Sequence, residues 1–176
     1  MATPDHFDTT CEWPRWPGVT EHRGEGDAAG LRIALVVSRF NLRHTAALLR
    51  GAVETLLSLG ARPGDLEVAW VPGAYEIPLV VEALAARRTF DAVCALGCVI
   101  EGETPHAALI NSTVAATLSE ISRRHGVPVL DAVVPARTEA QAATRCGPGP
   151  NNRGAYAARA AVEMARLMAR LRRASP

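Results

Sequence analysis

Four short apolar runs alternate with stretches of helical periodicity along most of the chain, and this alternation restricts the fold more than any other feature. The runs cover residues 32–38, 66–71, 91–98 and 127–134. Continuous apolar runs of this length are typical of strands that are buried on both faces. Strands that alternate with helices form a parallel sheet with right-handed crossovers. We therefore predict an α/β fold, a three-layer α/β/α arrangement with a four-stranded parallel sheet and helices on both faces.

Helical patterns follow the predicted strands. The predicted helices are one that ends at Gly60, one that carries the apolar residues of 79–85, one from Thr104 to Gly126, a short one over 138–145 and one over 152–171. Because the carboxyl ends of parallel strands meet at one edge of the sheet, ligands of such folds bind in the loops there. We expect the binding site among the turns that begin at Phe40, Pro72, Gly97 and about Pro135.

The first 30 residues differ in composition from the rest of the chain. They are rich in Pro, Gly and charged residues and show neither helical nor strand periodicity. We predict a flexible N-terminal arm over residues 1–30 and one α/β domain over residues 31–176. Trp13 and Trp16 are unusual in such an arm, because large apolar rings tend to cover a surface. We expect them to pack either on their own domain or on a neighbouring subunit.

Charge and cysteine content narrow the class of protein. A net charge of +1 gives no electrostatic reason to expect nucleic acid or a membrane as a partner. The four cysteines, at positions 11, 94, 98 and 146, form no Cys-x-x-Cys pair, which favours free thiols in a reducing compartment over a zinc site. No secretory leader and no apolar run of membrane-spanning length is recognisable. We therefore expect a cytoplasmic protein.

The stretch from Gly97 to His106 joins the third predicted strand to the third predicted helix. Thr104 suits the N-cap position and Pro105 suits the first helical position, so the loop should present backbone N–H groups and the positive end of a helix dipole. A phosphate is a common occupant of such a site, and His106 could move protons beside it. The alternative is an ordinary strand-to-helix turn in which His106 caps the helix or faces solvent.

The other turns supply complementary groups. Phe40 offers a stacking ring, residues 74–76 offer backbone donors and a carboxylate, and Arg145 and Arg153 offer guanidinium groups. A ring, polar backbone groups and a phosphate site together suit a reaction that joins a flat amine to a small phosphorylated molecule. Composition does not identify the reactants, and an unrelated α/β protein that binds phosphorylated sugars is an alternative.

Four segments resemble those of the lumazine synthase family in sequence, order and spacing. They are Ser38-Arg39-Phe40-Asn41, Val71-Pro72-Gly73-Ala74-Tyr75-Glu76-Ile77-Pro78, Gly97 to His106, and Arg145-Cys146-Gly147 continuing to Asn152-Arg153-Gly154. The resemblance covers about residues 31–171. It implies a flavodoxin-like fold and a transferase, 6,7-dimethyl-8-ribityllumazine synthase. That enzyme condenses 5-amino-6-(D-ribitylamino)uracil with 3,4-dihydroxy-2-butanone 4-phosphate in riboflavin biosynthesis, releases phosphate and water, and needs no metal or organic cofactor.

The same resemblance implies a role for each candidate residue. His106 would be the catalytic proton shuttle. The ribitylaminouracil would bind to Phe40, Ala74, Tyr75, Glu76, Cys98, Val99 and Ile100, with Asp131 and Arg153 at two further positions that contact it in the family. The butanone phosphate would bind to Glu103, Thr104 and Arg145, and a planar guanidinium suits that task.

The resemblance also implies an assembly. Members of this family form pentamers, and often icosahedral shells of pentamers, with each active site shared between adjacent subunits. It therefore implies a homo-oligomer, a neighbour on which Trp13 and Trp16 can lie, and riboflavin synthase as a candidate partner. The segment from Cys146 to Gly154 carries no insertion relative to the family pattern, which is compatible with a shell.

Four departures from the family pattern fall near the expected site. Glu101 replaces a basic residue, Ala107 and Ala108 replace an aromatic residue and an aspartate, Asp131 replaces a phenylalanine of the neighbouring subunit, and Arg153 replaces a lysine. Loss of a stacking ring weakens ligand binding by about 1–3 kcal/mol. Two hypotheses follow: a working lumazine synthase, or a non-catalytic paralogue that binds ribitylated flavin precursors or forms a shell.

Overall fold

The four strands form one parallel sheet in the order β2-β1-β3-β4. The computed structural model describes residue 14 and residues 16–174. Its elements are β1 (Ile33–Ser38), α1 (Leu42–Ser58), η1 (Pro63–Asp65), β2 (Leu66–Val71), η2 (Ala74–Glu76), α2 (Ile77–Ala86), β3 (Ala92–Ile100), α3 (His106–His125), β4 (Val129–Ala136), α4 (Glu139–Cys146) and α5 (Arg153–Ala174). This arrangement confirms the predicted three-layer, flavodoxin-like α/β/α fold.

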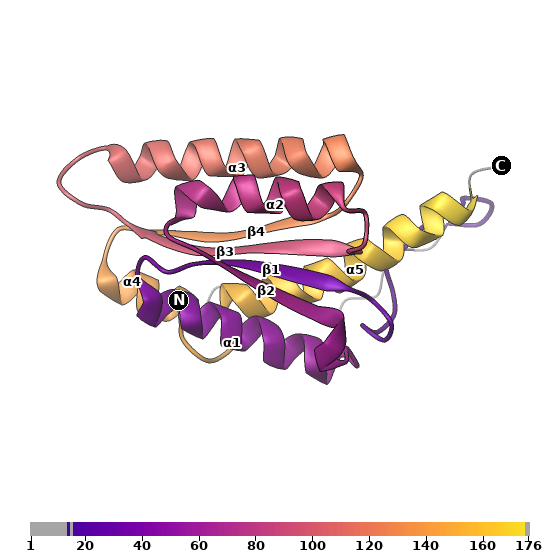
Figure 1. Ribbon diagram of the computed structural model, residues 1–176. Helices are drawn as coiled ribbons and strands as arrows, with labels where there is room; N and C mark the ends of the chain where they lie inside the picture. The colour runs from indigo at the N-terminus through magenta and orange to yellow at the C-terminus, as the bar shows by residue number, and fades with distance from the viewer. Residues whose placement is uncertain (1–13, 15, 175–176) are drawn as a thin grey trace.

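Helices cover both faces of the sheet, with α2 and α3 on one face and α1, α4 and α5 on the other (Figure 1). Alternate strand residues point to opposite faces, so Leu35 and Val37 of β1 lie in the cluster beneath α1 and α5, whereas Ala34 and Val36 lie in the cluster beneath α2. All six residues of β1 are buried. Full burial of a side chain such as Leu35 stabilises the fold by about 1.5–3 kcal/mol, so both layers contribute to the core.

Small residues allow α1 and α5 to approach closely. A Cβ atom on Gly154 would lie only 2.0 Å from the carbonyl oxygen of Leu48, so this position of α5 admits no side chain. Further along α5 a stripe of small apolar residues is buried: Ala157, Ala158, Ala161, Val162 and Ala165. The stripe is therefore a packing surface, as the sequence pattern predicted.

The ends of two strands differ from the prediction. β3 runs two residues past the predicted end at Cys98, and β4 begins and ends two residues later than predicted. The reason is the pairing between them, since Val99 pairs with Pro135 and Ile100 pairs with Ala136. Hydropathy follows burial and not pairing, so it could not locate these ends.

The segment before β1 lies along the C-terminal half of α5. A Cβ atom on Gly24 would lie 1.9 Å from the carbonyl oxygen of Glu163, and Arg166 donates through Nε to the carbonyl of Asp27 (2.9 Å). Trp16 is 64% exposed and lines a hollow together with Arg170. Trp13 lies outside the described residues. The proposed boundary between a flexible arm and the domain stays a prediction.

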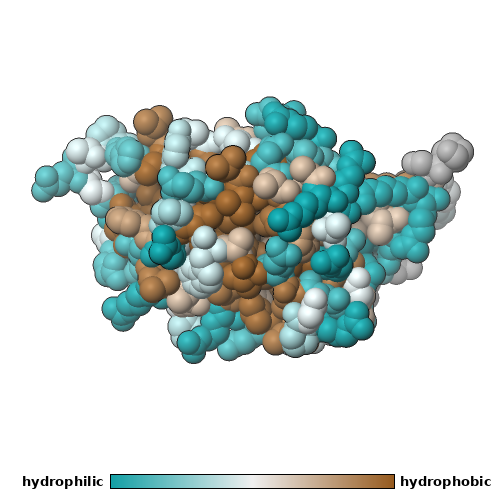
Figure 2. Space-filling view, in the orientation of Figure 1, coloured by the Kyte–Doolittle hydropathy of each residue, from teal (hydrophilic) through white to brown (hydrophobic). Residues whose placement is uncertain are grey.

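Apolar side chains remain exposed around β2, which forms one edge of the sheet. They are Phe40, Leu42, Val68, Trp70, Tyr75 and Leu79. In the space-filling view, apolar surface gathers across the middle of the face on which β2 lies (Figure 2). An exposed apolar area of this kind is typical of a contact surface for another protein.

Candidate functional site

The turns that follow β1 and β2 and the last part of β3 are joined by hydrogen bonds. The backbone N–H of Phe40 donates to the carbonyl of Pro72 (2.9 Å). The next residue, Asn41, has a left-handed backbone (φ 57°), and its side-chain amide donates to the carbonyl of Cys98 (3.0 Å). These bonds fix the base of Phe40 between two neighbouring turns, while its ring stays 71% exposed. The ring is therefore available to stack on a flat ligand.

The turn after β2 forms the short helix η2 and leads directly into α2. Ala74 is buried, whereas Tyr75 and Glu76 are exposed. A Cβ atom on Gly73 would lie 2.9 Å from Oε2 of Glu76, so the carboxylate folds back over the glycine at the end of β2. A side chain at Gly73 would therefore displace the Glu76 carboxylate from this position.

Gly97 allows η2 and α2 to sit close to β3. A Cβ atom there would lie 3.1 Å from Val133 and 3.3 Å from Cδ1 of Ile77. Ile77 follows Glu76 directly. The absence of a side chain at Gly97 therefore lets the Ala74–Glu76 turn lie close to the end of β3. Cys98 is buried, whereas Val99 and Ile100 are partly exposed beside that turn.

The loop between β3 and α3 is fully exposed from Glu101 to His106. The predicted N-cap at Thr104 is wrong by one residue, since α3 begins at His106 and Pro105 occupies the cap position. The N–H of Leu109 donates to the carbonyl of Pro105 (3.3 Å), so the first helical turn closes on the proline. The N–H groups of a first turn have no partner within the helix, which places the positive end of the dipole at His106.

A hollow of about 370 Å³ lies along the outer edge of β4. It is lined by Asp131, Ala132, Val133, Val134, Pro135, Arg145, Arg153 and Tyr156. Three of the predicted site residues therefore share it, although they come from β4, α4 and α5. One carboxylate and two guanidinium groups make this hollow suitable for a small polar ligand that carries a negative charge.

Asp131 lies on the exposed edge of the sheet. Its Oδ1 accepts a hydrogen bond from the backbone N–H of Val133 (2.9 Å). β4 is an edge strand, so no further strand among the described residues lies beside it to accept a hydrogen bond. The protein atoms around the carboxyl group raise its pKa by removing water, and the bond from Val133 only partly offsets this effect. One carboxylate oxygen of Asp131 therefore accepts a hydrogen bond from the edge strand, and the other can contact a ligand in the hollow.

Tyr156 is a residue of this hollow that the sequence did not point to. The guanidinium carbon of Arg153 lies 5.3 Å from the centre of the Tyr156 ring, within the range of a cation–π contact. Both residues belong to α5, and residues three apart share a helix face. That spacing is the signal in the sequence that could have identified Tyr156.

The predicted site residues thus fall into two groups. The first group follows or ends three neighbouring strands: Phe40 and the Ala74–Glu76 turn follow β1 and β2, Cys98, Val99 and Ile100 end β3, and Glu103, Thr104 and His106 lie between β3 and the start of α3. Asp131, Arg145 and Arg153 share the hollow at β4, and no residue of the first group lines it. β2 and β4 form opposite edges of the sheet, so Phe40 and the Ala74–Glu76 turn lie on the β2 side of β3 and the hollow lies on its β4 side.

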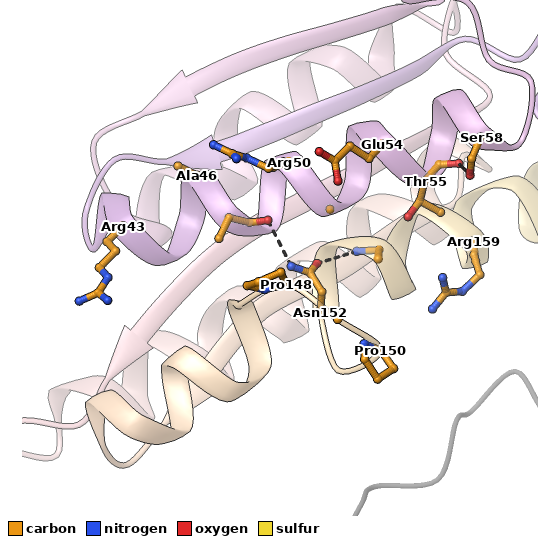
Figure 3. Close-up of a pocket in the computed structure, with 14 residues that line it drawn as sticks. Arg43, Ala46, Arg50, Glu54, Thr55, Ser58, Pro148, Pro150, Asn152 and Arg159 are labelled. Atoms are coloured by element: carbon orange, nitrogen blue, oxygen red, sulfur yellow. Dashed lines mark hydrogen bonds between the residues drawn. The ribbon is translucent and has the colours of Figure 1, made fainter.

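A larger hollow, of about 610 Å³, lies between α1 and the beginning of α5 (Figure 3). Arg43, Arg50, Glu54, Pro148, Asn152 and Arg159 are among the residues that line it. It contains none of the predicted site residues, and Asn152 spans it with hydrogen bonds to α1 and to α5. Size alone therefore does not identify the site in this protein.

Among residues 14 and 16–174, no three His, Cys, Asp or Glu side chains are arranged so that they could hold a metal ion. None of the helices described here combines the length and the apolar character needed to cross a bilayer.

Comparison with protein families identifies the family of this chain. Residues 30–169 match the family model described as 6,7-dimethyl-8-ribityllumazine synthase. The matched span is far more than half of the chain, begins just before β1 and includes every predicted site residue.

Proposed function

Because the chain belongs to the 6,7-dimethyl-8-ribityllumazine synthase family, we propose that it catalyses the condensation of 5-amino-6-(D-ribitylamino)uracil with 3,4-dihydroxy-2-butanone 4-phosphate. The observation that carries this proposal is that hydrogen bonds from Phe40 and Asn41 join the turn after β1 to the turn after β2 and to the end of β3, so that the exposed ring of Phe40 lies beside the turn that carries the Glu76 carboxylate. These groups suit a flat, polyhydroxylated amine.

The reaction needs proton transfers at each stage. The amine attacks the ketone and water leaves to form an imine, phosphate departs to leave an enol, and the second amine closes the ring with loss of water. His106, at the beginning of α3 and exposed, moves the protons, which accelerates such steps by about 10² to 10⁴-fold. Holding the two reactants together contributes up to about 7–11 kcal/mol.

Two kinds of group bind the phosphate of the butanone phosphate. Backbone N–H groups at the N-terminus of α3, beside Glu103 and Thr104, bind one side of the phosphate. Arg145 binds it from the other side, since a guanidinium forms two parallel hydrogen bonds with phosphate oxygens. Asp131 and Arg153, which share a hollow with Arg145, contact the ribitylaminouracil.

The two groups of site residues are brought together by a second copy of the chain. This proposal is supported by the position of Phe40 and the Ala74–Glu76 turn on the β2 side of β3, away from the hollow at β4, and by the apolar surface around β2 and α2 (Figure 2). A homo-oligomer of this kind takes the form of a pentamer, with a shell of pentamers as the larger assembly and riboflavin synthase as a further partner. We place the protein in the cytoplasm, where the substrates of riboflavin biosynthesis are made.

The test is to incubate the purified protein with both substrates and to follow the fluorescence of the lumazine product. Turnover well above the rate without protein supports the enzyme. Folded protein that binds the ribitylaminouracil but does not exceed the spontaneous rate supports the non-catalytic paralogue instead. Protein that binds neither substrate contradicts both.

A further inference from the structure

Arg153 lies at an electrostatically unfavourable position. It is the first residue of α5, at the end of the helix where the dipole repels a positive charge, and the first turn of α5 contains no acidic residue. A second guanidinium, that of Arg145, lines the same hollow. Among the described residues, no carboxylate forms an ion pair with Arg153. Charge pairing within this part of the chain therefore does not hold the Arg153 side chain in place.

The Asp131 carboxylate lines the hollow but does not neutralise the two arginines. Burial raises the pKa of Asp131, the hydrogen bond from the Val133 N–H lowers it, and neither arginine contributes. A guanidinium only donates hydrogen bonds, and a carboxylate only accepts them. The hollow therefore offers two donor groups and one acceptor group to a ligand that carries both acceptors and donors.

The ring of Tyr156 is the group that lies against Arg153. The guanidinium carbon is 5.3 Å from the centre of the ring, which is a cation–π distance. The backbone beneath both side chains is fixed by Asn152, which is 3% exposed. Its carbonyl accepts from the N–H of Tyr156 (3.1 Å), and its Oδ1 accepts from the N–H of Ala155 (2.9 Å). The ring therefore stands on a rigid first turn of α5.

We propose that Tyr156 is a positioning residue, which holds the Arg153 guanidinium over its ring at the hollow so that Arg153 donates to the carbonyl oxygens of a flat heterocycle. This inference rests on the proposed function, in which Arg153 contacts the ribitylaminouracil. The uracil ring of that substrate carries carbonyl oxygens as acceptors, and its N–H groups can donate to Asp131. A guanidinium that is already held in place loses less side-chain entropy on binding, so the ring strengthens binding without touching the substrate.

Two substitutions at position 156 separate the ring from the hydroxyl group. Tyr156→Leu removes the ring, and Tyr156→Phe keeps it. We expect KM for the ribitylaminouracil to rise by about 3- to 30-fold in Tyr156→Leu, which is the range of a cation–π contact, and to stay nearly unchanged in Tyr156→Phe. In both variants kcat and KM for the butanone phosphate should stay close to the parent values. Tyr156 is partly exposed, so leucine leaves no core cavity, and Tyr156→Met is a second variant without the ring.

A double-mutant cycle tests whether Tyr156 acts through Arg153. Tyr156→Leu is introduced both into the parent protein and into the Arg153→Ala variant. We expect the rise in KM for the ribitylaminouracil in the parent background and no further rise in the Arg153→Ala background. An equal rise in both backgrounds would show that Tyr156 contacts the substrate itself, and this would overturn the proposal.

A measurement without substrate tests the contact directly. Phenylglyoxal modifies accessible guanidinium groups, and mass spectrometry of peptides gives the rate at each arginine. Arg153 should react faster in Tyr156→Leu than in the parent or in Tyr156→Phe, because the ring no longer covers one face of the guanidinium. Arg137, an exposed arginine before α4, should react at the same rate in all three proteins.

The outcomes distinguish this proposal from the proposed function. Equal labelling of Arg153 in all three proteins, or a rise in KM in Tyr156→Phe as large as in Tyr156→Leu, would overturn the role of the ring. Parallel rises in KM for both substrates would indicate general damage and would also overturn it. A parent protein without turnover would reject the proposed function and this substrate, whereas faster labelling in Tyr156→Leu would still show that the ring holds Arg153.

Discussion

The carboxamide of Asn152 occupies the space in which a side chain on Gly51 would lie. A Cβ atom on Gly51 would be 2.4 Å from Oδ1 of Asn152. Asn152 uses this position to donate to the carbonyls of Cys146 (2.7 Å) and Gly147 (3.0 Å) and to accept from the N–H of Ala155 (2.9 Å). The close approach of one asparagine to one glycine thus connects α1 with the end of α4 and the beginning of α5 (Figure 3).

Gly51→Ala should destabilise the protein, because the new methyl group displaces the Asn152 side chain and disturbs its hydrogen bonds. We expect the free energy of unfolding to fall by about 1–3 kcal/mol, measured by urea denaturation. Gly64→Ala is the matched control, since nothing lies within 4 Å of a Cβ atom at that position. Equal stability of the two variants would contradict the role given to the contact.

His106→Gln should slow catalysis without abolishing binding, because glutamine keeps polar contacts but cannot exchange a proton near neutral pH. We expect kcat for lumazine formation to fall by about 10² to 10⁴-fold, with KM for both substrates nearly unchanged. His22→Gln, at an exposed position of the segment before β1, should leave kcat as it is. An unaltered kcat in the His106→Gln variant would show that His106 does not transfer protons in the reaction.

Arg145→Ala should weaken binding of the phosphorylated substrate, because it removes charge-assisted hydrogen bonds. We expect KM for the butanone phosphate to rise by about 10- to 100-fold, with a smaller change for the ribitylaminouracil. Arg137→Ala, an exposed arginine just before α4, is the control. A larger rise in KM for the ribitylaminouracil than for the butanone phosphate would contradict the role of Arg145 in binding the phosphate.

Mixtures of two impaired variants test whether the site is shared between copies. Subunits with His106→Gln keep an intact Arg145, and subunits with Arg145→Ala keep an intact His106. If a site combines residues of two chains, oligomers re-formed from both variants contain some complete sites, and kcat/KM for the butanone phosphate rises above the mean of the two separate variants. Mixed oligomers whose kcat/KM equals that mean would show that one chain supplies the whole site.

Asp131→Asn should alter the pH dependence of stability. The pKa of Asp131 is raised in the folded protein, so the folded state binds the proton more tightly than the unfolded state. The free energy of unfolding therefore falls as the pH rises from the unfolded pKa, near 3.9, through the folded pKa. Asparagine carries no charge at any pH, so the variant should not lose stability in this way and should be slightly more stable than the parent protein at pH 7. Near pH 3, where Asp131 is protonated, the two proteins should be equally stable. Thermal melts at both pH values check this, and a less stable variant at pH 7 would contradict it.

The sequence predicted the order and type of the elements because burial follows the apolar pattern directly. β2 lies where its apolar run predicted it, and the stop at Gly126 is the left-handed end of α3. The strand order, the extra pairs of β3 with β4 and the one-residue shift of the α3 cap depend on contacts between distant segments. Single-residue patterns do not carry that information.

Part of the candidate site could likewise be predicted from the sequence, and part could not. The ring of Phe40 and the Ala74–Glu76 turn could be placed together because both follow neighbouring strand ends. Arg145 and Asp131 line the same hollow because α4 and α5 pack against an edge strand. No spacing within the sequence indicates that they lie together.

The segment that lies along α5 has a consequence for protein engineering. Trp16 and Arg170 line one hollow, so the described part of the segment before β1 reaches the C-terminal end of α5 (Figure 1). A circular permutation that omits residues 1–15 therefore needs only a short linker from the end of α5 to residue 16, since neighbouring ends tolerate joining. New termini opened at Gly102, an exposed glycine with free space around it, would leave all four strands in their present order in space.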